Sequence, residues 1–567
     1  MSRCFFELKK TDEVVFADSI PGVGKGDYVQ IWKVTTESIC KERFVVVELF
    51  CGFKVDFPYS LPDIYLPALE YKYIPHRDFL SGKLCLAPED CIYDIDDCKR
   101  LVRNCIKRAL TIVESYGRQS DSIYNEEIIS YWNEADNEEP IVDCYGELHG
   151  SLPCESCVLE AVEYKKNIVL HGKEKVGTSV IIFNDENNST EEYVNSLQVC
   201  RYGEVFYVNS FVLPSCPPYK LTFGQFLDKI SDIADRKAIR KFINKNRGGT
   251  IIFRLTESMF GGVLIKQIPS QRNGFRRGSL SCYQELRGFE NHNKNLQRLF
   301  GKVLSTKRIS MRTSGQKLTE KTFVVAGMGS LGSNLTYFLS AWQGARMMLV
   351  DDDILDVDNI GRHFLGYRDT ASHKVDAMAK HLRGVDPTRK IIAVRKRLQE
   401  VIYNKIDDLN SSDALFVCTG SHMSEQCVID SIRAKQLKVP VFIIWVEPYC
   451  VAGHMIYLNP AMLPDNLELF SPNGIKLYKY NLIDDEEYED YEKFIKRDAG
   501  CNSDYTNYSG NDVVLFLSSI YQEINKLLMF PDKSKFYRWV GNLKVAEEKG
   551  IKLKCLPQIG ELQIMWL

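Results

Sequence analysis

The segment Thr322-Phe323-Val324-Val325-Ala326-Gly327-Met328-Gly329-Ser330-Leu331-Gly332 decides how the C-terminal half of the chain folds. Its first five residues have the apolar pattern of a buried strand, and they lead directly into a G-x-G-x-x-G turn. In such a turn Gly327 permits the tight bend, Gly329 lets the backbone approach a phosphate, and Gly332 lets the next helix pack on the strand. The segment therefore predicts a nucleotide site at a helix N-terminus.

The residues around this segment predict the type of sheet. Asp351 ends the next apolar run, nineteen residues after Gly332, where a ribose-binding carboxylate belongs. Further strand-like runs at 391–394, 414–418 and 441–446 alternate with helical stretches. We expect residues 296–567 to form a doubly wound, Rossmann-like domain with a mostly parallel sheet.

The acidic and basic residues that follow narrow the choice of nucleotide. Together with the glycine turn, Asp351-x-Asp353, Asn359-x-x-Arg362 and Lys374 form an ordered set that resembles the ThiF/MoeB and ubiquitin-activating family over roughly residues 300–450. The resemblance implies ATP-dependent adenylation, in which Asp351 holds the ribose and Asn359, Arg362 and Lys374 contact the triphosphate. Cationic side chains suit adenylation, because negative charge builds up on the departing pyrophosphate. An NAD-dependent oxidoreductase would leave them unexplained.

The magnesium ligand departs from the family pattern. The family places an aspartate after the strand at 414–418, but this chain has Gly420 there. We expect ATP and Mg²⁺ as cofactors, with Asp351, Asp353 or Glu425 as the open alternatives for the metal carboxylate. In related enzymes an arginine ahead of the glycine turn reaches the ATP phosphates, and Arg298 is the candidate here.

A cysteine downstream of this core could receive the activated acyl group. Cys501 lies between Gly500 and a polar stretch, in a loop that leads into a helix over 512–528. Its place resembles that of the catalytic cysteine of ubiquitin-activating enzymes, which implies a thioester. A structural or free thiol is the alternative.

The N-terminal region offers a second cysteine. A β-rich run, a proline-rich stretch, His76 and then Gly82-Lys83-Leu84-Cys85-Leu86 resemble a ubiquitin-conjugating domain over residues 1–140. The resemblance implies an α+β fold with Cys85 as the catalytic cysteine and His76 beside it. The family's oxyanion-stabilising asparagine is missing, since the local order is Pro-His-Arg-Asp with Asp78. Either His76 takes over that task or the mechanism differs.

The middle of the chain carries no catalytic pattern. Short β-like runs separated by polar loops predict a mixed α/β connector over residues 141–295. Cys154-x-x-Cys157 has metal-ligand spacing, but no second such pair exists and a tetrahedral zinc site needs four ligands. We expect no metal at this pair.

The composition excludes several other classes of protein. The chain has 567 residues, too many for one hydrophobic core, so we expect three domains. A formal net charge of −3 predicts no nucleic-acid partner, and no apolar run predicts a membrane span or a signal peptide. We expect a cytoplasmic protein, whose 18 cysteines are mostly buried and reduced.

The order of the motifs along one chain indicates a combined function. A conjugating-like domain, a connector and an activating-like domain resemble the fused transferases of bacterial CBASS anti-phage operons. The resemblance implies a homodimer and a relay in which a partner's C-terminal carboxylate is adenylated, passed to Cys501, then to Cys85, and joined to an amine. In that family the partner is a CD-NTase, a cyclic-nucleotide synthase. Three alternatives stay open: activation of a ubiquitin-like protein, activation of a sulfur carrier, and a non-catalytic scaffold with a degenerate nucleotide site.

Overall fold

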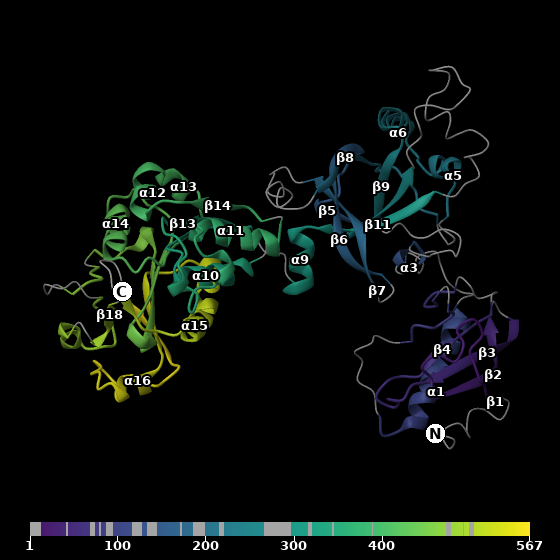
Figure 1. Ribbon diagram of the computed structural model, residues 1–567, viewed down its shortest axis with the longest axis horizontal. Helices are drawn as coiled ribbons and strands as arrows, with labels where there is room; N and C mark the ends of the chain where they lie inside the picture. The colour runs from purple at the N-terminus through teal and green to yellow at the C-terminus, as the bar shows by residue number, and fades with distance from the viewer. Residues whose placement is uncertain are drawn as a thin grey trace. The chain divides into compact units, whose positions relative to one another are not determined.

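The computed structural model describes residues 13–40, 43–68, 74–78, 81–86, 95–115, 128–132, 144–170, 173–184, 199–214, 220–265, 296–315, 320–342, 345–387, 389–465, 467–471, 478–490, 493–497 and 504–567. The described residues up to Val303 form one compact unit, and those from Leu304 onward form a second (Figure 1). The predicted α/β architecture is confirmed in both.

The first part of the N-terminal unit is an antiparallel meander covered by one long helix. Inward-facing Val34 and Leu49 pack against Val102 and Ala109, which recur on one side of the helix at helical spacing. This confirms the predicted α+β fold. The elements are β1 Glu13–Phe16, β2 Gln30–Cys40, β3 Arg43–Phe53, β4 Asp63–Tyr65 and α1 Cys98–Ser115.

The second part of this unit is a closed barrel with the strand order β10-β11-β5-β7-β6-β8-β9. Leu148, Val205 and Ile252 belong to a buried cluster that draws on strands all round the barrel. Phe253, next to Ile252, points to the other face of β9 and packs there with Phe226 and Ile239 of the helices. The elements are α3 Ile128–Trp132, β5 Cys144–Gly150, β6 Cys157–Leu170, β7 Lys173–Asn184, β8 Val199–Tyr207, α5 Phe223–Asp228, α6 Ile233–Asn246, β9 Gly249–Thr256, β10 Met259–Ile265 and β11 Gln297–Leu304.

The last strand of the barrel bears on one predicted boundary. β11 pairs with β10 throughout, so the residues with which the third domain was expected to begin are part of the barrel. Arg298 lies in this strand, and its guanidinium lies 5.7 Å from the ring of Trp132. The domain boundary at residue 296 stays a prediction, and so does the phosphate-binding role of Arg298. The contact between Arg298 and Trp132 lies within the N-terminal unit.

The C-terminal unit is built on an eight-stranded sheet with the order β14-β13-β12-β15-β16-β17-β20-β21. The strands from β14 to β16 are parallel, and the others are added antiparallel, which confirms the doubly wound prediction. The strands are β12 Thr322–Ala326, β13 Arg346–Val350, β14 Ile391–Val394, β15 Ala414–Val417, β16 Val441–Val446, β17 Ala452–Leu458, β20 Lys535–Val540 and β21 Leu562–Trp566.

Helices bury both faces of this sheet. Phe323 and Val325 of β12 pack in one core with Leu335 and Phe516, whereas Val324 packs in another with Ile429. Such a strand, buried on both faces, reads as a continuous apolar run. The α-helices described in this unit, not all of which cover the sheet, are α9 Thr306–Thr313, α10 Ser330–Ser340, α11 Lys374–Val385, α12 Leu398–Asn404, α13 Ile406–Asn410, α14 His422–Arg433, α15 Gly510–Met529 and α16 Leu543–Glu548.

The strand order of this sheet reverses between β12 and β15. From β12 the chain moves outward to β13 and β14, and it then returns to β15 on the other side of β12. Doubly wound sheets bind ligands beyond the carboxyl ends of the strands at such a point. The glycine turn follows β12 and Gly420 follows β15, so both lie there. Among the described helices none is long and apolar enough to cross a bilayer.

Candidate functional site

The three glycines of the turn differ in the space that surrounds them. Gly327 has φ +85°, and a Cβ there would lie 2.7 Å from the backbone of Cys418 and Thr419. A Cβ on Gly332 would lie 1.7 Å from the carbonyl oxygen of Gly327, which no side chain can tolerate. A Cβ on Gly329 would meet no atom within 4 Å. Gly327 and Gly332 are therefore required for packing, whereas the space at Gly329 is open.

That open space faces the start of a helix with free donors. Gly329 is the N-cap of α10 and makes no side-chain capping bond, so the first N–H groups of the helix are left for an anion. Asp351 holds the turn from the other side: its carboxylate accepts from the backbone N–H of Met328 and, at 2.8 Å, from that of Asp353. Each carboxylate oxygen keeps a second lone pair, so a ribose hydroxyl can still donate to it. The geometry fits ATP.

Lys374 and Asp353 form an ion pair within the same site. The lysine is 6% exposed at the first residue of α11, and its ammonium donates to the Asp353 carboxylate. Burial raises the pKa of Asp353, but the hydrogen bond and charge of Lys374 outweigh it, so the pKa lies below its usual value. Asp353 thus balances the positive charge of Lys374, the lysine that is expected from the sequence to contact the triphosphate.

Arg362 connects the glycine turn with the C-terminal segment. Its carbonyl oxygen accepts from Ser330 Oγ at 3.0 Å, at the first turn of α10. Its guanidinium donates to the carbonyl of Thr506 at 3.3 Å and lies 5.0 Å from the ring centroid of Tyr508. Asn359 lies in the short turn before it and accepts from Asp356 N. The predicted cationic and amide residues therefore lie around one helix N-terminus, although their contacts with a nucleotide stay predictions.

His363 is a residue of this site that sequence reasoning missed. Its Nε2 lies 2.8 Å from the carbonyl oxygen of Met328, and its Nδ1 accepts from Leu365 N at 3.0 Å. These partners require the neutral form with the proton on Nε2. Burial lowers the pKa of His363, which favours the same form. The ring thus holds the Met328 carbonyl of the glycine turn. The sequence signal that could have pointed to His363 is its position directly after Arg362.

The possible magnesium ligands are not gathered into one cluster. Among the described residues no group of three or more His, Cys, Asp or Glu side chains could hold a metal ion. Gly420 has φ +59° with open space around it. Glu425 is fully buried in the first turn of α14 and accepts from Tyr478 Oη at 2.7 Å. Burial raises its pKa to about 7 despite that bond, so Glu425 is poorly suited to bind a metal.

The buried Glu425 gives a stability prediction. Because its folded pKa of about 7 lies above the ordinary value of 4.5, its favourable contribution is complete below pH 4.5 and is lost as the pH rises through 7. We expect Glu425→Gln to remove this loss of unfolding free energy. The loss is on the order of 3 kcal/mol, since each unit of difference between the folded and ordinary pKa corresponds to about 1.4 kcal/mol. Thermal unfolding at pH 5 and pH 8 tests this. Glu400 is an exposed glutamate in the first turn of α12, and Glu400→Gln should leave the pH dependence of stability unchanged.

The predicted thioester residue Cys501 lies outside the described residues. The flanking strands β18 Ile495–Arg497 and β19 Asp504–Thr506 form an antiparallel ladder, with Arg497 opposite Asp504. In sequence, Cys501 falls between these two strands. Arg362 binds the carbonyl of Thr506, the last residue of β19, and this contact ties β19 to the glycine-turn region.

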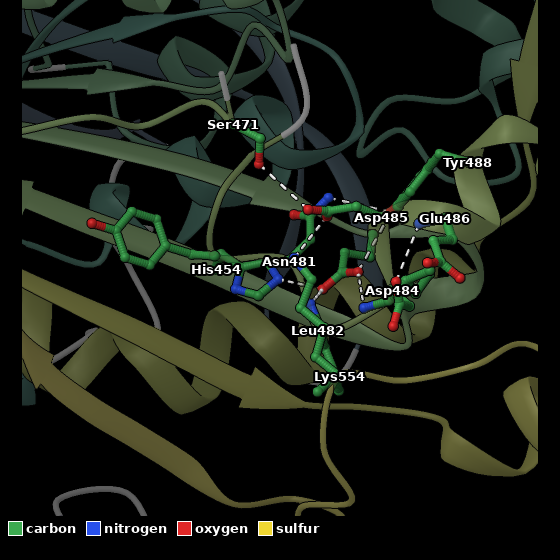
Figure 2. A network of polar contacts seen from close by, with 12 residues as sticks. His454, Ser471, Asn481, Leu482, Asp484, Asp485, Glu486, Tyr488 and Lys554 are labelled. Atoms are coloured by element: carbon green, nitrogen blue, oxygen red, sulfur yellow. Dashed lines mark hydrogen bonds and ion pairs between the residues drawn. The ribbon is translucent and has the colours of Figure 1, made fainter. Parts of the chain in front are cut away.

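The buried carboxylate of Glu447 holds the chain that leads into β18. Figure 2 shows the network of polar contacts in which His454, Leu482 and Tyr488 take part. Glu447 accepts from the backbone N–H of Leu482 at 2.6 Å and of Ile483 at 2.9 Å, and its Oε1 lies 2.6 Å from His454 Nε2. Both side chains are fully buried, and burial lowers the pKa of His454. Three contacts from residues 482–488, including a longer one from Tyr488, thus hold this segment at the end of β16, while His454 holds the carboxylate from β17.

The N-terminal unit brings His76 and Cys85 together through the backbone. Cys85 N donates to the carbonyl of His76 at 2.7 Å, and both residues are exposed. His76 has φ +60°, a left-handed conformation that costs energy for a residue with a side chain. The exposed thiol beside this bend is the arrangement that the resemblance implied, while the catalytic roles of both residues stay predictions.

Neighbouring charges bear on how Cys85 could work. Asp78 accepts from Ser81 N at 2.8 Å and from Ser81 Oγ, so its carboxylate caps the turn and offers no oxyanion donor. Lys83 lies 2.7 Å from Asp63, which also accepts from Tyr28 Oη at 2.6 Å. The charge of Lys83, which could have assisted a thiolate at Cys85, is thus balanced by Asp63.

Three further described cysteines, Cys154, Cys157 and Cys418, were also considered from the sequence. Cys154 is exposed and Cys157 partly buried, and no metal cluster forms around them among the described residues. Burial raises the pKa of the Cys418 thiol far above its ordinary value, which makes it a poor nucleophile.

Two sequence families match the chain. Residues 304–461 match the ThiF family, and residues 28–140 match prokaryotic E2 family B. These regions coincide with the two candidate sites, and they confirm the predicted resemblance to a fused activating and conjugating protein.

Several individual proteins are similar to parts of this chain. The ATP-dependent ubiquitin transferase-like protein Cap2 of Pseudomonas aeruginosa (strain BWHPSA011 / Pa011) is 26% identical over 59% of this chain and 60% of its own length. Ubiquitin-like modifier-activating enzyme 5 of Bombyx mori is 23% identical over 29% of this chain and 43% of its own. The tRNA threonylcarbamoyladenosine dehydratase of Bacillus subtilis (strain 168) is 27% identical over 20% of this chain and 46% of its own. The chain therefore spans less than two thirds of each of these relatives.

Proposed function

We propose that this chain is an ATP-dependent enzyme that activates the C-terminal carboxylate of a protein partner and transfers it through two thioesters to an amine. The observation that carries the proposal is the joining of two sites in one polypeptide. A glycine turn with Arg362 and Lys374 beside it lies in the ThiF-matching region, and an exposed Cys85 next to His76 lies in the E2-matching region.

The first step is adenylation. A carboxylate oxygen of the partner bonds to the α-phosphorus of ATP, and the bond to the bridging oxygen breaks to release pyrophosphate. The free N–H groups of α10 and the side chains of Arg362 and Lys374 would stabilise the charge on the leaving group. Asp351 would position the ribose. Lys374 is held by Asp353 until a phosphate competes for it.

The later steps exchange one acyl bond for another. The Cys501 thiolate attacks the acyl adenylate and expels AMP, and the Cys85 thiolate then displaces Cys501 from the acyl group. An amine, for which a lysine is the natural candidate, finally attacks the Cys85 thioester to form an amide and free the thiol. The one exchange between thiols, from Cys501 to Cys85, needs no further ATP, because the bond formed and the bond broken are both thioesters.

Magnesium would bind chiefly through the nucleotide. Mg²⁺ usually keeps several waters and takes one or two carboxylates together with substrate phosphates. Asp351 and Asp353 are the carboxylates nearest the glycine turn, and they fit this role better than the buried Glu425. The metal would supply charge neutralisation on the phosphates.

The partner is part of the same proposal. Since one relative is named a ubiquitin transferase-like protein, we propose a protein substrate presented by its C-terminus. The resemblance of the motif order to the fused transferases of CBASS operons favours a CD-NTase in anti-phage defence as that substrate. We further propose a homodimer that acts in the cytoplasm. Activation of a sulfur carrier is less favoured, since it would leave Cys85 and the E2-matching region without a task.

ATP–pyrophosphate exchange tests the activation step. The full chain should exchange labelled pyrophosphate into ATP only when the CD-NTase with an intact C-terminus is present, and a partner lacking its last residues should give none. Arg362→Ala should lower the exchange rate roughly 100-fold or more, as removal of one charge-stabilising donor does. Arg346→Ala, which removes an arginine paired with Glu320 on the surface, is the matched control. Absence of partner-dependent exchange in the wild type would overturn the proposal.

A further inference from the structure

A cavity of about 360 Å³ lies beside Arg362 and is distinct from the open space at Gly329. It is shallow and open to solvent, and it is lined by Arg362, Tyr449, Asn507, Tyr508, Asp512 and Asn542 among others. Its volume is at the lower end of the range for ligand pockets, roughly 300–1,000 Å³. It could therefore hold a few residues of a peptide.

The walls of the cavity are fixed by backbone contacts. Tyr449 has φ +58°, its N–H donates to the Asn507 carbonyl at 2.7 Å, and its hydroxyl donates to the carbonyl of Lys493 at 2.9 Å. On the other side α15 begins so close to Arg362 that a Cβ on Gly510 would lie 3.1 Å from its Cα. Asn542 N donates to the carbonyl of Cys450 at 3.1 Å. The cavity is therefore preformed.

Three polar side chains that line it have no partner within the described part of the chain. No hydrogen bond or ion pair is found for the side chains of Asn507, Asp512 and Asn542 among these residues. Burial raises the pKa of Asp512, as expected for a carboxyl group without a cation beside it. The cavity thus offers two amides, one carboxyl and the Arg362 guanidinium, a mixture of donors and acceptors.

Arg362 belongs to both the cavity and the nucleotide site. Arg362 lines the cavity, and its carbonyl accepts from Ser330 at the first turn of α10. A group bound in the cavity would therefore lie next to the place where a carboxylate has to meet the α-phosphate. It would also lie next to β19, which ends the connection that carries Cys501.

We infer that this cavity binds the residues of the partner that precede its terminal carboxylate. The inference rests on the proposed function and adds a specificity site to it. Peptide N–H and C=O groups match the amides of Asn507 and Asn542, and the terminal carboxylate would lie toward Arg362. Asp512 is the one carboxylate among the lining residues, so it selects a tail with a lysine or arginine a few positions before its end.

Selection from a peptide pool tests this assignment. The full-length chain, immobilised, is exposed to peptides with a free C-terminal carboxylate and six randomised final positions, and the retained peptides are sequenced by mass spectrometry. The wild type should enrich lysine or arginine several-fold at one position, and the same pool with amidated C-termini should not be retained. Asp512→Lys should exchange this preference for aspartate or glutamate. Val545→Trp, which fills the cavity from α16, should reduce retention at least tenfold.

Controls separate this inference from the proposed function. Asp465→Lys reverses an exposed charge outside the cavity and should keep the wild-type preference. Thermal unfolding of each variant shows whether it is folded. If Val545→Trp does not fold, the result with Asp512→Lys decides the test. Equal enrichment by the wild type and Asp512→Lys, or no enrichment at all, would overturn the cavity assignment. Enrichment without any ATP–pyrophosphate exchange would support the cavity while contradicting adenylation.

Discussion

Cys501→Ala is expected to abolish every thiol-sensitive adduct between this chain and its partner, whereas Cys85→Ala should retain one adduct on Cys501. The order of the relay is the reason. If Cys501 receives the acyl group first, its loss leaves no route to Cys85, while loss of Cys85 strands the acyl group upstream. Product amide should be absent in both variants, and pyrophosphate exchange should persist in both.

Non-reducing and reducing gels after incubation with ATP, Mg²⁺ and the CD-NTase measure these adducts. The chain offers matched controls, since Cys154 and Cys555 are also exposed and free. Cys154→Ala and Cys555→Ala should behave as the wild type, which excludes a general effect of removing a surface thiol. An adduct that survives Cys501→Ala but disappears in Cys85→Ala would show direct transfer from the adenylate to Cys85. If neither substitution changes product formation, the two-cysteine relay is wrong.

Local patterns predicted the parts of the molecule that depend on neighbours in sequence. The five apolar runs predicted for the parallel sheet match β12, β13, β14, β15 and β16 to within a residue or so. This works because a strand buried on both faces must be apolar at every position. The glycine turn was equally clear, because two of its glycines are imposed by contacts that no side chain could survive.

Long-range pairings account for what the sequence could not reveal. The contact of Arg362 with Thr506 joins residues 144 positions apart, and the pairing of Lys83 with Asp63 depends on how the segment around Lys83 lies against β4. The same holds for the barrel, where β11 closes against β10 and β5 across a long intervening segment. Such pairings follow from tertiary geometry, and no local periodicity encodes them.

The carboxylates show a further limit of sequence reasoning. Glu425 was an acceptable metal candidate by residue type, yet it is buried against Tyr478. Asp351 was assigned to the ribose, and the structure adds a second task, the clamping of the glycine turn. Residue type states what a side chain can do, whereas burial and existing partners decide what it is free to do.

Gly332→Ala is expected to damage both the fold and ATP binding of the C-terminal unit. The new methyl group would be placed 1.7 Å from the Gly327 carbonyl. Gly327 has little room to move away, because even a Cβ on it would lie 2.7 Å from the backbone of Cys418 and Thr419. Overpacking of this kind costs about 3 kcal/mol when the surroundings cannot adjust. Since the collision lies within the turn itself, its relief must displace the first N–H groups of α10.

A series of glycine substitutions separates the two effects. Gly329→Ala meets no atom within 4 Å and has φ −77°, so the fold should keep its thermal stability. The methyl group would nevertheless occupy the space where a phosphate approaches the helix, and ATP affinity should fall roughly tenfold or more, about 1.4 kcal/mol. Gly384→Ala, inside α11 with open space around it, should bind ATP normally and gain up to about 1 kcal/mol of stability.

Thermal unfolding and calorimetric ATP titration of the three variants measure these outcomes. Normal ATP binding by Gly329→Ala would show that the phosphates do not approach this part of the turn, and the nucleotide site would have to be placed elsewhere on the sheet edge. Wild-type stability of Gly332→Ala would show that α10 can shift away from β12. In that case the close packing of helix and turn would not be what positions the donors for a phosphate.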